Sequence, residues 1–234
     1  MLSVREPGGG VILGGTLSIA IDGPAGVGKS TIAKAIAREL DYTYVDTGAM
    51  FRAVTLFALE QGIEIDAEHQ QEMLATIEAA DFDFIFVDGF LRIYHGSRDI
   101  TEDIRSQEVT RMVSHVAALP EIRQGLCVLQ RQMASSANVV MEGRDIGTVV
   151  LPKASYKFFL TASAEVRAMR RYQELISKGR KVDFSSILAQ ITERDSLDSS
   201  REHAPLCKAD DAIEIDTSNL SIVEVIRLIL SKIK

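Results

Sequence analysis

The chain has 234 residues, with 33 acidic and 26 basic side chains and a formal net charge of -7. Its content of 46% hydrophobic and 25% charged residues is that of an ordinary globular protein, which excludes collagen, coiled-coil and wholly disordered chains. No apolar run reaches the roughly 18 residues that span a bilayer, and the acidic balance disfavours a nucleic-acid-binding surface.

The N-terminal sequence and the cysteines indicate in which cellular compartment the protein is expected. The start of the chain lacks the apolar core and the cleavage site of a signal peptide. Cys127 and Cys207 lie far apart and lack metal-ligand spacing, so we expect both to be reduced and buried in a cytoplasmic protein.

The length predicts one compact unit with an inserted or appended piece. Residues 1–16 hold five glycines and no periodicity, which predicts a flexible extension without a function.

Order is predicted to begin with a strand, a loop and a helix. Residues 17–21 form an apolar run that suits a buried strand, and residues 22–28 are rich in glycine. From residue 29 to residue 40, apolar side chains recur at helical spacing. A strand over 42–45 and a helix over 49–61 follow, so the sequence opens like a βαβ unit.

The next segment has a different character. Two β-rich runs, 82–87 and 90–94, flank Asp88-Gly89, and Asp-Gly between such runs indicates a β-hairpin. The alternating phenylalanines of the first run are interpreted as hairpin core rather than a base-stacking platform. Because antiparallel strands do not belong in a doubly wound parallel sheet, we expect a small inserted subdomain at about 63–104.

Helices and strands alternate through the remainder of the chain. This alternation predicts an α/β fold, with a mainly parallel sheet and helices on both faces. The predicted helices cover 105–118, 121–135, 164–178, 184–197 and 222–233, and the predicted strands cover 138–141, 156–160 and 212–216.

The glycine-rich turn carries the first functional motif. Residues 23–30 read Gly-Pro-Ala-Gly-Val-Gly-Lys-Ser, which fits G-x-x-x-x-G-K-[ST] between a strand and a helix. Glycines let backbone N–H groups converge on phosphate oxygens, and the helix N-terminus adds partial positive charge. Lys29 is predicted to reach the β- and γ-phosphates of ATP, and the Ser30 hydroxyl to hold Mg²⁺. The alternative is a glycine turn with an incidental Lys-Ser pair.

A second anion site separates small phosphotransferases from other proteins with this loop. The sequence has no Asn-Lys-x-Asp run of a GTPase, and it is too short for an AAA-type or transport ATPase. Candidate arginines for such a site occur in three places: Arg52, Arg144-Asp145 and the run 193–201, where arginines are interspersed with acidic residues. Arg144 follows an apolar strand, and ligands bind at the carboxyl ends of parallel strands. The run 193–201, taken alone, fits an exposed helix face as well as a binding site.

Four motifs, in this order, carry a resemblance to a known family. They are Ile-Asp-Gly-Pro-Ala-Gly-Val-Gly-Lys-Ser at 21–30, Asp-Thr-Gly-Ala-Met-Phe-Arg at 46–52, Glu-Gly-Arg-Asp-Ile-Gly-Thr at 142–148 and Glu-Arg-Asp-x-x-Asp-x-x-Arg at 193–201. Together they resemble bacterial cytidylate kinase, a nucleoside-monophosphate-kinase family, over residues 17–234. The resemblance implies a P-loop kinase fold with an inserted nucleotide-binding subdomain and a lid at about 164–201. It also implies a monomer that transfers a phosphoryl group from ATP to CMP or dCMP.

The resemblance implies roles for single residues in binding the acceptor. Arg52 and Arg144 match arginines that hold the monophosphate, where a planar guanidinium binds two oxygens at once. Asp145 matches a base reader, since a carboxylate accepts from the exocyclic amine of cytosine and meets a carbonyl in uracil. The implied substrate-binding residues are Thr47, Arg52, Ser114, Arg123, Arg144, Asp145, Arg194, Asp198 and Arg201.

The resemblance also implies the phosphate donor and metal sites. The family often has serine where Thr47 stands and aspartate where Glu142 stands, so both are departures. Ser30 and Glu142 are the implied Mg²⁺ residues, the latter through water. The implied catalytic residues are Lys29, Arg144, Arg170 and Arg194. The implied ATP-binding residues are Gly23, Pro24, Ala25, Gly26, Val27, Gly28, Lys29, Ser30, Thr31, Arg170 and Arg171.

Two alternatives to a CMP and dCMP kinase stay open from the sequence. One is a broader kinase that accepts UMP as well as CMP, and the other is a sensor that binds ATP without turnover. Intact Lys29 and Ser30, together with a second arginine site, disfavour the sensor. Neither nucleic acid nor a membrane is expected as a partner.

Overall fold

A computed structural model describes residues 3–5, 16–80, 82–87 and 90–233. The chain divides into two compact units, each described here by itself. The first unit comprises residues 1–18 and 37–141, and the second comprises residues 19–36 and 142–234. Strands of the second unit pair in parallel, whereas the first unit combines parallel pairs with an antiparallel hairpin. Helices alternate with these strands along the chain, which confirms the predicted α/β class.

Three parallel strands form the core of the second unit. They are β2 (Ser18–Asp22), β8 (Tyr156–Thr161) and β9 (Ile213–Asp216), in the order β2-β8-β9. Ile19, Ile21 and Phe158 are fully buried, as expected for parallel strands covered by helices. Helix α1 (Lys29–Leu40) follows β2 after the glycine-rich turn, and α8 (Ile222–Leu230) ends the chain. The strand, loop and helix predicted from the sequence are therefore confirmed.

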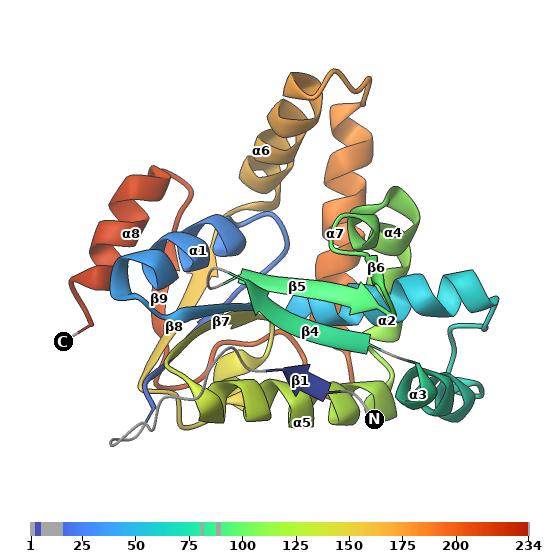
Figure 1. The fold of residues 1–234 in the computed structure, drawn as a ribbon. Coiled ribbons are helices and arrows are strands. Elements are labelled where there is room, and N and C mark those ends of the chain that lie inside the picture. Colours follow the sequence, from blue (N-terminus) through green and yellow to red (C-terminus); the bar gives the residue numbers. More distant parts are fainter. Residues whose placement is uncertain (1–2, 6–15, 81, 88–89, 234) are drawn as a thin grey trace. The chain divides into compact units, whose positions relative to one another are not determined.

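Helices α6 (Ala164–Ser177) and α7 (Phe184–Ser200) form a pair in the second unit (Figure 1). Their shared core consists of Ala168 and Leu175 on α6 and Ile187 and Ile191 on α7. At their joined ends, the Tyr172 ring meets the edge of the Phe184 ring at a centroid distance of 6.2 Å. Side chains of Ser163 and Asp183 cap the two N-termini by accepting backbone hydrogen bonds.

A β-hairpin lies in the first unit. Strands β4 (Phe82–Val87) and β5 (Phe90–His95) pair antiparallel, which confirms the predicted pairing, and Asp88-Gly89 lie outside the described residues. Phe82 and Phe84 are buried, so the phenylalanine alternation does form a core. However, β5 also pairs in parallel with β3 (Thr43–Asp46). The expectation that the hairpin stands apart from the parallel strands is wrong, because β5 supplies hydrogen-bond partners to β3.

Short strands extend this sheet. Strand β1 (Ser3–Arg5) pairs in parallel with β4, so three residues of the expected flexible extension are in a strand. Residues 1–2 and 6–15 of that extension lie outside the described residues. Strand β6 (Arg98–Asp99) pairs with β5, and β7 (Val139–Gly143) follows β3 and runs to the boundary of the unit.

The helices of the first unit are set by local signals. Asp46 caps α2 (Thr47–Gln61) and Ser106 caps α4 (Gln107–Val116), while Pro120 occupies the first turn of α5 (Pro120–Ser136). The unit also contains α3 (Gln70–Ala79) and the short helix η1 (Asp103–Arg105), neither of which was predicted as a separate element. Among the described residues, no helix is both long enough and apolar enough to cross a membrane.

The two cysteines are free thiols, but they are not both buried. Cys127 on α5 is partly buried, and Cys207 lies exposed in the segment between α7 and β9. The expectation of two buried cysteines is therefore wrong. Cysteine packs well in a core when the fold offers an apolar site, and the segment that holds Cys207 is a surface loop.

Candidate active site

The loop between β2 and α1 has the geometry of a phosphate cradle. Gly23, Gly26 and Gly28 have φ angles of 147°, 78° and 99°, which favour glycine. A Cβ atom on Gly23 would lie 2.3 Å from the backbone oxygen of Leu160, so no side chain fits at this position. Such left-handed turns direct successive N–H groups toward one point, which is how a backbone binds phosphate oxygens. The loop residues therefore fit the phosphates of ATP.

Lys29 is the first residue of α1 and is only 6% exposed. Its Nζ atom donates a hydrogen bond to the Pro24 oxygen at 2.8 Å, so the side chain folds back over the loop. Burial and the positive charge of Arg144 together lower the pKa of Lys29 from 10.5 to about 7, whereas Glu142 opposes the shift. Positive charges therefore lie close together at the loop, and a bound phosphate would reduce the repulsion between them.

A buried carboxylate organises three arginines in the same unit. Asp198 on α7 is 3% exposed, and its Oδ2 atom accepts from Arg144 Nε at 2.8 Å and lies 3.9 Å from Arg194 Nε. Arg201 Nε donates to the Asp198 backbone oxygen at 3.1 Å. Burial raises the pKa of Asp198, but the charges of Arg144 and Arg194 outweigh it and lower the pKa. Because Asp198 and Arg201 are buried, the run 193–201 is not an exposed helix face.

Glu142 and Ser30 offer oxygen ligands near this charge. Glu142 is buried toward the end of β7, and its charge acts on Lys29. Ser30 follows Lys29 at the start of α1 and is exposed. A hydroxyl and a carboxylate are the hard oxygen donors that Mg²⁺ prefers. The chemistry of these two oxygen donors fits Mg²⁺, and their assignment to the metal remains a prediction.

Arg167 also contacts the phosphate loop, although sequence reasoning did not select it. Its Nη1 atom donates to the Ala25 oxygen at 3.0 Å, and its Nη2 atom donates to Asp195 Oδ2 on α7 at 2.6 Å. Its Nε atom donates to the Ala162 oxygen at 3.0 Å. Arg167 is buried and joins the loop to both α6 and α7.

The two predicted ATP-binding arginines of α6 have other partners here. Arg170 donates from Nη2 to the Thr217 backbone oxygen at 2.6 Å and from Nη1 to Thr217 Oγ1 at 3.1 Å. Arg171 pairs with Glu174 on the exposed face of the same helix, at 2.7 Å. Their assignment to ATP remains a prediction.

The first unit carries the other predicted substrate ligands. Thr47 begins α2 and Ser114 lies on α4, and both are buried. Arg52 Nη1 donates to Thr110 Oγ1 at 2.8 Å, which ties α2 to α4. Arg123 on α5 is buried, with its guanidinium carbon 5.3 Å from the centroid of the Phe51 ring. All four residues belong to the first unit, in which Arg52 and Arg123 contact other side chains of that unit.

Asp22 is a second residue that sequence reasoning did not select. It ends β2, directly before the phosphate loop, and is 4% exposed. Its Oδ1 atom accepts from the Ile146 N–H at 2.8 Å, and its Oδ2 atom accepts from the Gly147 N–H at 2.7 Å. These amides open the helical turn η2 (Ile146–Val150), directly after Arg144 and Asp145. The partners are 124 residues apart in sequence, so no local pattern indicates the contact.

The buried Asp22 carboxyl makes stability depend on pH in an unusual direction. Burial raises its pKa from 3.8 to about 6; the two backbone hydrogen bonds and Lys29 oppose the shift, and Asp145 adds to it. A raised folded-state pKa contributes stability that is present below pH 4 and is lost as the pH rises through 6. Relative to Asp22→Asn, the wild type should therefore gain about 2 kcal/mol of unfolding free energy between pH 7 and pH 4.

Urea unfolding of both proteins at several pH values tests this expectation. The comparison with Asp22→Asn cancels the titration of the other carboxyl groups. A stability difference that is flat with pH, or that favours the variant at pH 4, would contradict the raised pKa.

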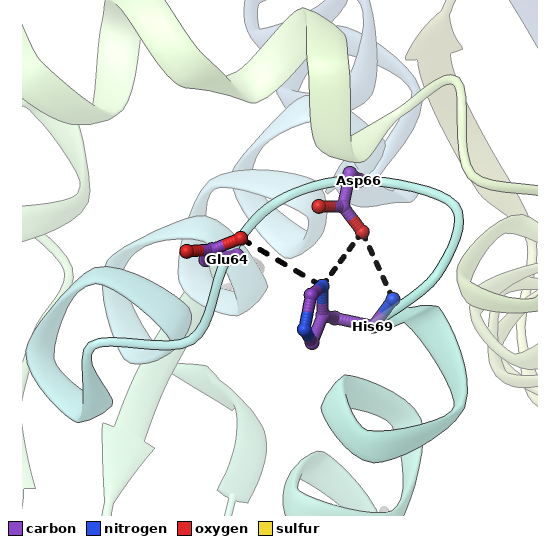
Figure 2. A group of neighbouring side chains, drawn as sticks. All are labelled: Glu64, Asp66 and His69. Atoms are coloured by element: carbon purple, nitrogen blue, oxygen red, sulfur yellow. Dashed lines mark hydrogen bonds and ion pairs between the residues drawn. The ribbon is translucent and has the colours of Figure 1, made fainter.

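One group of potential metal ligands lies away from the phosphate loop. Among the described residues, Glu64, Asp66 and His69 place their ligand atoms within 4.8 Å of one another (Figure 2). Asp66 Oδ1 contacts His69 Nδ1 at 2.8 Å and accepts from the His69 and Glu68 backbone N–H groups, each at 2.9 Å. The hydrogen bond that Asp66 accepts from the imidazole raises the pKa of His69. These contacts order the turn before α3, so the group has a structural explanation without a metal.

A phosphate loop at the end of a parallel strand, with arginines that act electrostatically on its lysine, defines the class of P-loop kinases. The model of the cytidylate kinase family matches residues 19–234, and the chain belongs to that family. The resemblance noted in the sequence is thereby confirmed.

Curated relatives are similar over nearly their whole length. The cytidylate kinase of Carboxydothermus hydrogenoformans is 48% identical over 214 residues, which cover 92% of this chain and 96% of the relative. The cytidylate kinase of Clostridioides difficile is 47% identical, with coverage of 94% and 99%. That of Exiguobacterium sibiricum is 49% identical, with coverage of 90% and 93%. The chain is therefore an enzyme of the kinase class.

Proposed function

We propose that the protein transfers the γ-phosphoryl group of Mg·ATP to CMP or dCMP, giving ADP and CDP or dCDP. The observation that carries the proposal is electrostatic. Arg144 Nε lies 2.8 Å and Arg194 Nε 3.9 Å from the same oxygen, Asp198 Oδ2, so the two arginines lie close together. After burial, which is the largest cause, their charges contribute to the lowered pKa of Lys29, so this lysine shares the same positive environment. A donor phosphate and an acceptor phosphate can each offset part of this charge. Membership of the cytidylate kinase family favours cytidine nucleotides as the acceptor.

The chemistry requires little more than position and charge. The attacking oxygen of a nucleoside monophosphate is already an anion, so the reaction needs no general base. Catalysis consists of holding the two phosphates in line and neutralising the charge on the transferring group. Lys29, Arg144 and Arg194, with Arg170, are proposed to supply that positive charge. Mg²⁺ held by Ser30 and Glu142 would add positive charge at the donor phosphates.

Recognition of the base is proposed to depend on Asp145. This carboxylate is buried, and it can accept a hydrogen bond from the exocyclic amine of cytosine. Uracil presents a carbonyl oxygen at that position, which leaves two acceptors facing each other, and unpaired buried polar groups are a strong basis for rejection. Arg201, Asp198 and Arg194, together with Thr47, Arg52, Ser114 and Arg123 of the first unit, are the other proposed ligands of the acceptor.

The pair of helices α6 and α7 is proposed to act as the lid. A kinase must exclude water from the reacting phosphate, because water would otherwise accept the phosphoryl group. Arg167 supports this assignment, since it connects the phosphate loop at Ala25 to Asp195 on α7. Arg170 and Arg171 lie on α6 and are proposed to approach the ATP phosphates when the lid closes.

A coupled assay of ADP release tests the proposal. The acceptors are CMP, dCMP, UMP, AMP, GMP and dTMP, each with Mg·ATP, and the control omits the acceptor. We expect fast turnover with CMP and dCMP and at most a few per cent of that rate with the others. Equal turnover of UMP would contradict the role of Asp145 and indicate a broader pyrimidine kinase. Absence of turnover with every acceptor would contradict the proposed reaction.

A further inference from the structure

The Asp22 carboxylate binds a turn that holds two proposed acceptor ligands. Both of its oxygens are used, one on the Ile146 N–H and the other on the Gly147 N–H. These are the two residues that directly follow Arg144 and Asp145. The backbone that carries both ligands is therefore anchored to the end of β2, one residue before the phosphate loop begins.

Asp22 and Lys157 leave little room for a side chain at Gly147. A Cβ atom on Gly147 would lie 3.4 Å from Asp22 Oδ2 and 3.2 Å from Lys157 Cδ on β8. Lys157 is itself fixed, because its Nζ atom donates to the Pro152 oxygen at 2.7 Å and to Asp211 at 2.8 Å. The turn thus has little space in which to move while Asp22 holds it.

Only a carboxylate satisfies both amides of the turn. An asparagine at this position offers one acceptor oxygen, and its NH₂ group would face the second N–H donor. A buried donor left without a partner is costly, so the turn would shift. The phosphate-loop motif itself begins at Gly23, so the motif does not account for an acid at position 22.

We propose that Asp22 is a positioning residue for the acceptor nucleotide: it sets the place of Arg144 and Asp145 by holding the amides of Ile146 and Gly147. The proposal rests on the proposed function, because it assigns Arg144 and Asp145 to the acceptor. Asp198 holds the guanidinium of Arg144 at 2.8 Å from the other end. The backbone two residues after Arg144 is thereby held by Asp22, and the Arg144 side chain is held by α7.

The test is a comparison of two affinities in Asp22→Asn. We expect the Kd of CMP, measured by calorimetry without ATP, to rise about tenfold. The Kd of a non-hydrolysable ATP analogue, measured without CMP, should change less than threefold, because the loop glycines and Lys29 are intact. The control is Asp211→Asn, which removes an acid that also contacts Lys157 but leaves the two amides alone; its CMP affinity should match the wild type.

A double-mutant cycle separates positioning from a general loss of structure. If Asp22 acts through Arg144, then Asp22→Asn introduced into Arg144→Ala should weaken CMP binding by less than threefold. If Asp22→Asn does not fold, Gly147→Ala displaces the same amide while retaining the carboxylate, and it should show the same selective loss of CMP affinity. Equal losses for CMP and the ATP analogue, or multiplicative effects in the cycle, would overturn the proposal. A wild type that does not bind CMP would instead overturn the proposed function.

Discussion

Arg144→Ala is expected to lower kcat by at least two orders of magnitude while the protein stays folded. Arg144 is proposed to hold the acceptor phosphate and to neutralise charge on the transferring group, and loss of one such donor typically costs about 10²- to 10³-fold. The KM for CMP should rise as well, because the arginine contacts the ground state too. The Asp198 carboxylate keeps the charge of Arg194, whose Nε lies 3.9 Å from Asp198 Oδ2, and the charge of Arg201 also lowers its pKa, so the buried carboxylate remains compensated. Steady-state kinetics and thermal unfolding measure the two effects.

The matched control for this variant is Arg227→Ala. Arg227 is an exposed arginine on α8 in the same unit, without a proposed role. Arg227→Ala removes one guanidinium charge, as Arg144→Ala does, so an effect of net charge on activity would appear in both variants. Activity of Arg144→Ala within about threefold of the wild type would show that the assignment of Arg144 is wrong.

Lys29→Met is expected to abolish most turnover without loss of CMP binding. Methionine preserves the length and the apolar contacts of the side chain, but it removes the ammonium group that is proposed to follow the transferring phosphoryl group. We expect kcat to fall about 10²- to 10³-fold. The Kd of CMP should change less than threefold, because the arginines of the acceptor site are unchanged. The free energy of unfolding should not fall, since a buried charge is costly in the absence of nucleotide.

Lys34→Met provides the control for this second variant. Lys34 is exposed on the same helix, so its replacement tests whether any lysine of α1 supports turnover. Calorimetry with CMP and the coupled assay are sufficient to compare the two proteins. A Lys29→Met protein that keeps a tenth or more of its turnover would contradict the role of this lysine.

Much of the fold could be predicted because its signals are local. The core strands, α1, α6 and α7 have clear periodicity and caps, and the hairpin has two β-rich runs. Helix α3 was missed, since its buried face consists of little more than Met73 and Ile77. Strand β1 has three residues, and its partner β4 lies about 80 positions later, so no local pattern could identify it. The pairing of β5 with β3 was not predicted for a similar reason, because it joins strands that are about 45 positions apart in sequence.

The residues of the candidate site also differ in whether local sequence signals identify them. Lys29, Ser30 and Arg144 belong to motifs whose chemistry can be read from neighbouring residues. Asp22 and Arg167 could not be selected, because their roles depend on contacts with segments more than 120 residues away. The partners across these long separations are backbone groups, which carry no residue-type signal in a single sequence. The structure is therefore needed to show which charged residues hold the loops that the motifs define.

The hydrogen bonds of Arg167 limit which residues can replace it. Its three nitrogen atoms serve three separate acceptors, on the phosphate loop, at the start of α6 and on α7. A lysine has the same charge but only one nitrogen, and a single ammonium group cannot reach acceptors spread around a planar guanidinium. A substitution of Arg167 by lysine therefore keeps the positive charge but loses hydrogen bonds. Only a side chain with several separated N–H donors can hold the phosphate loop, α6 and α7 together at this position.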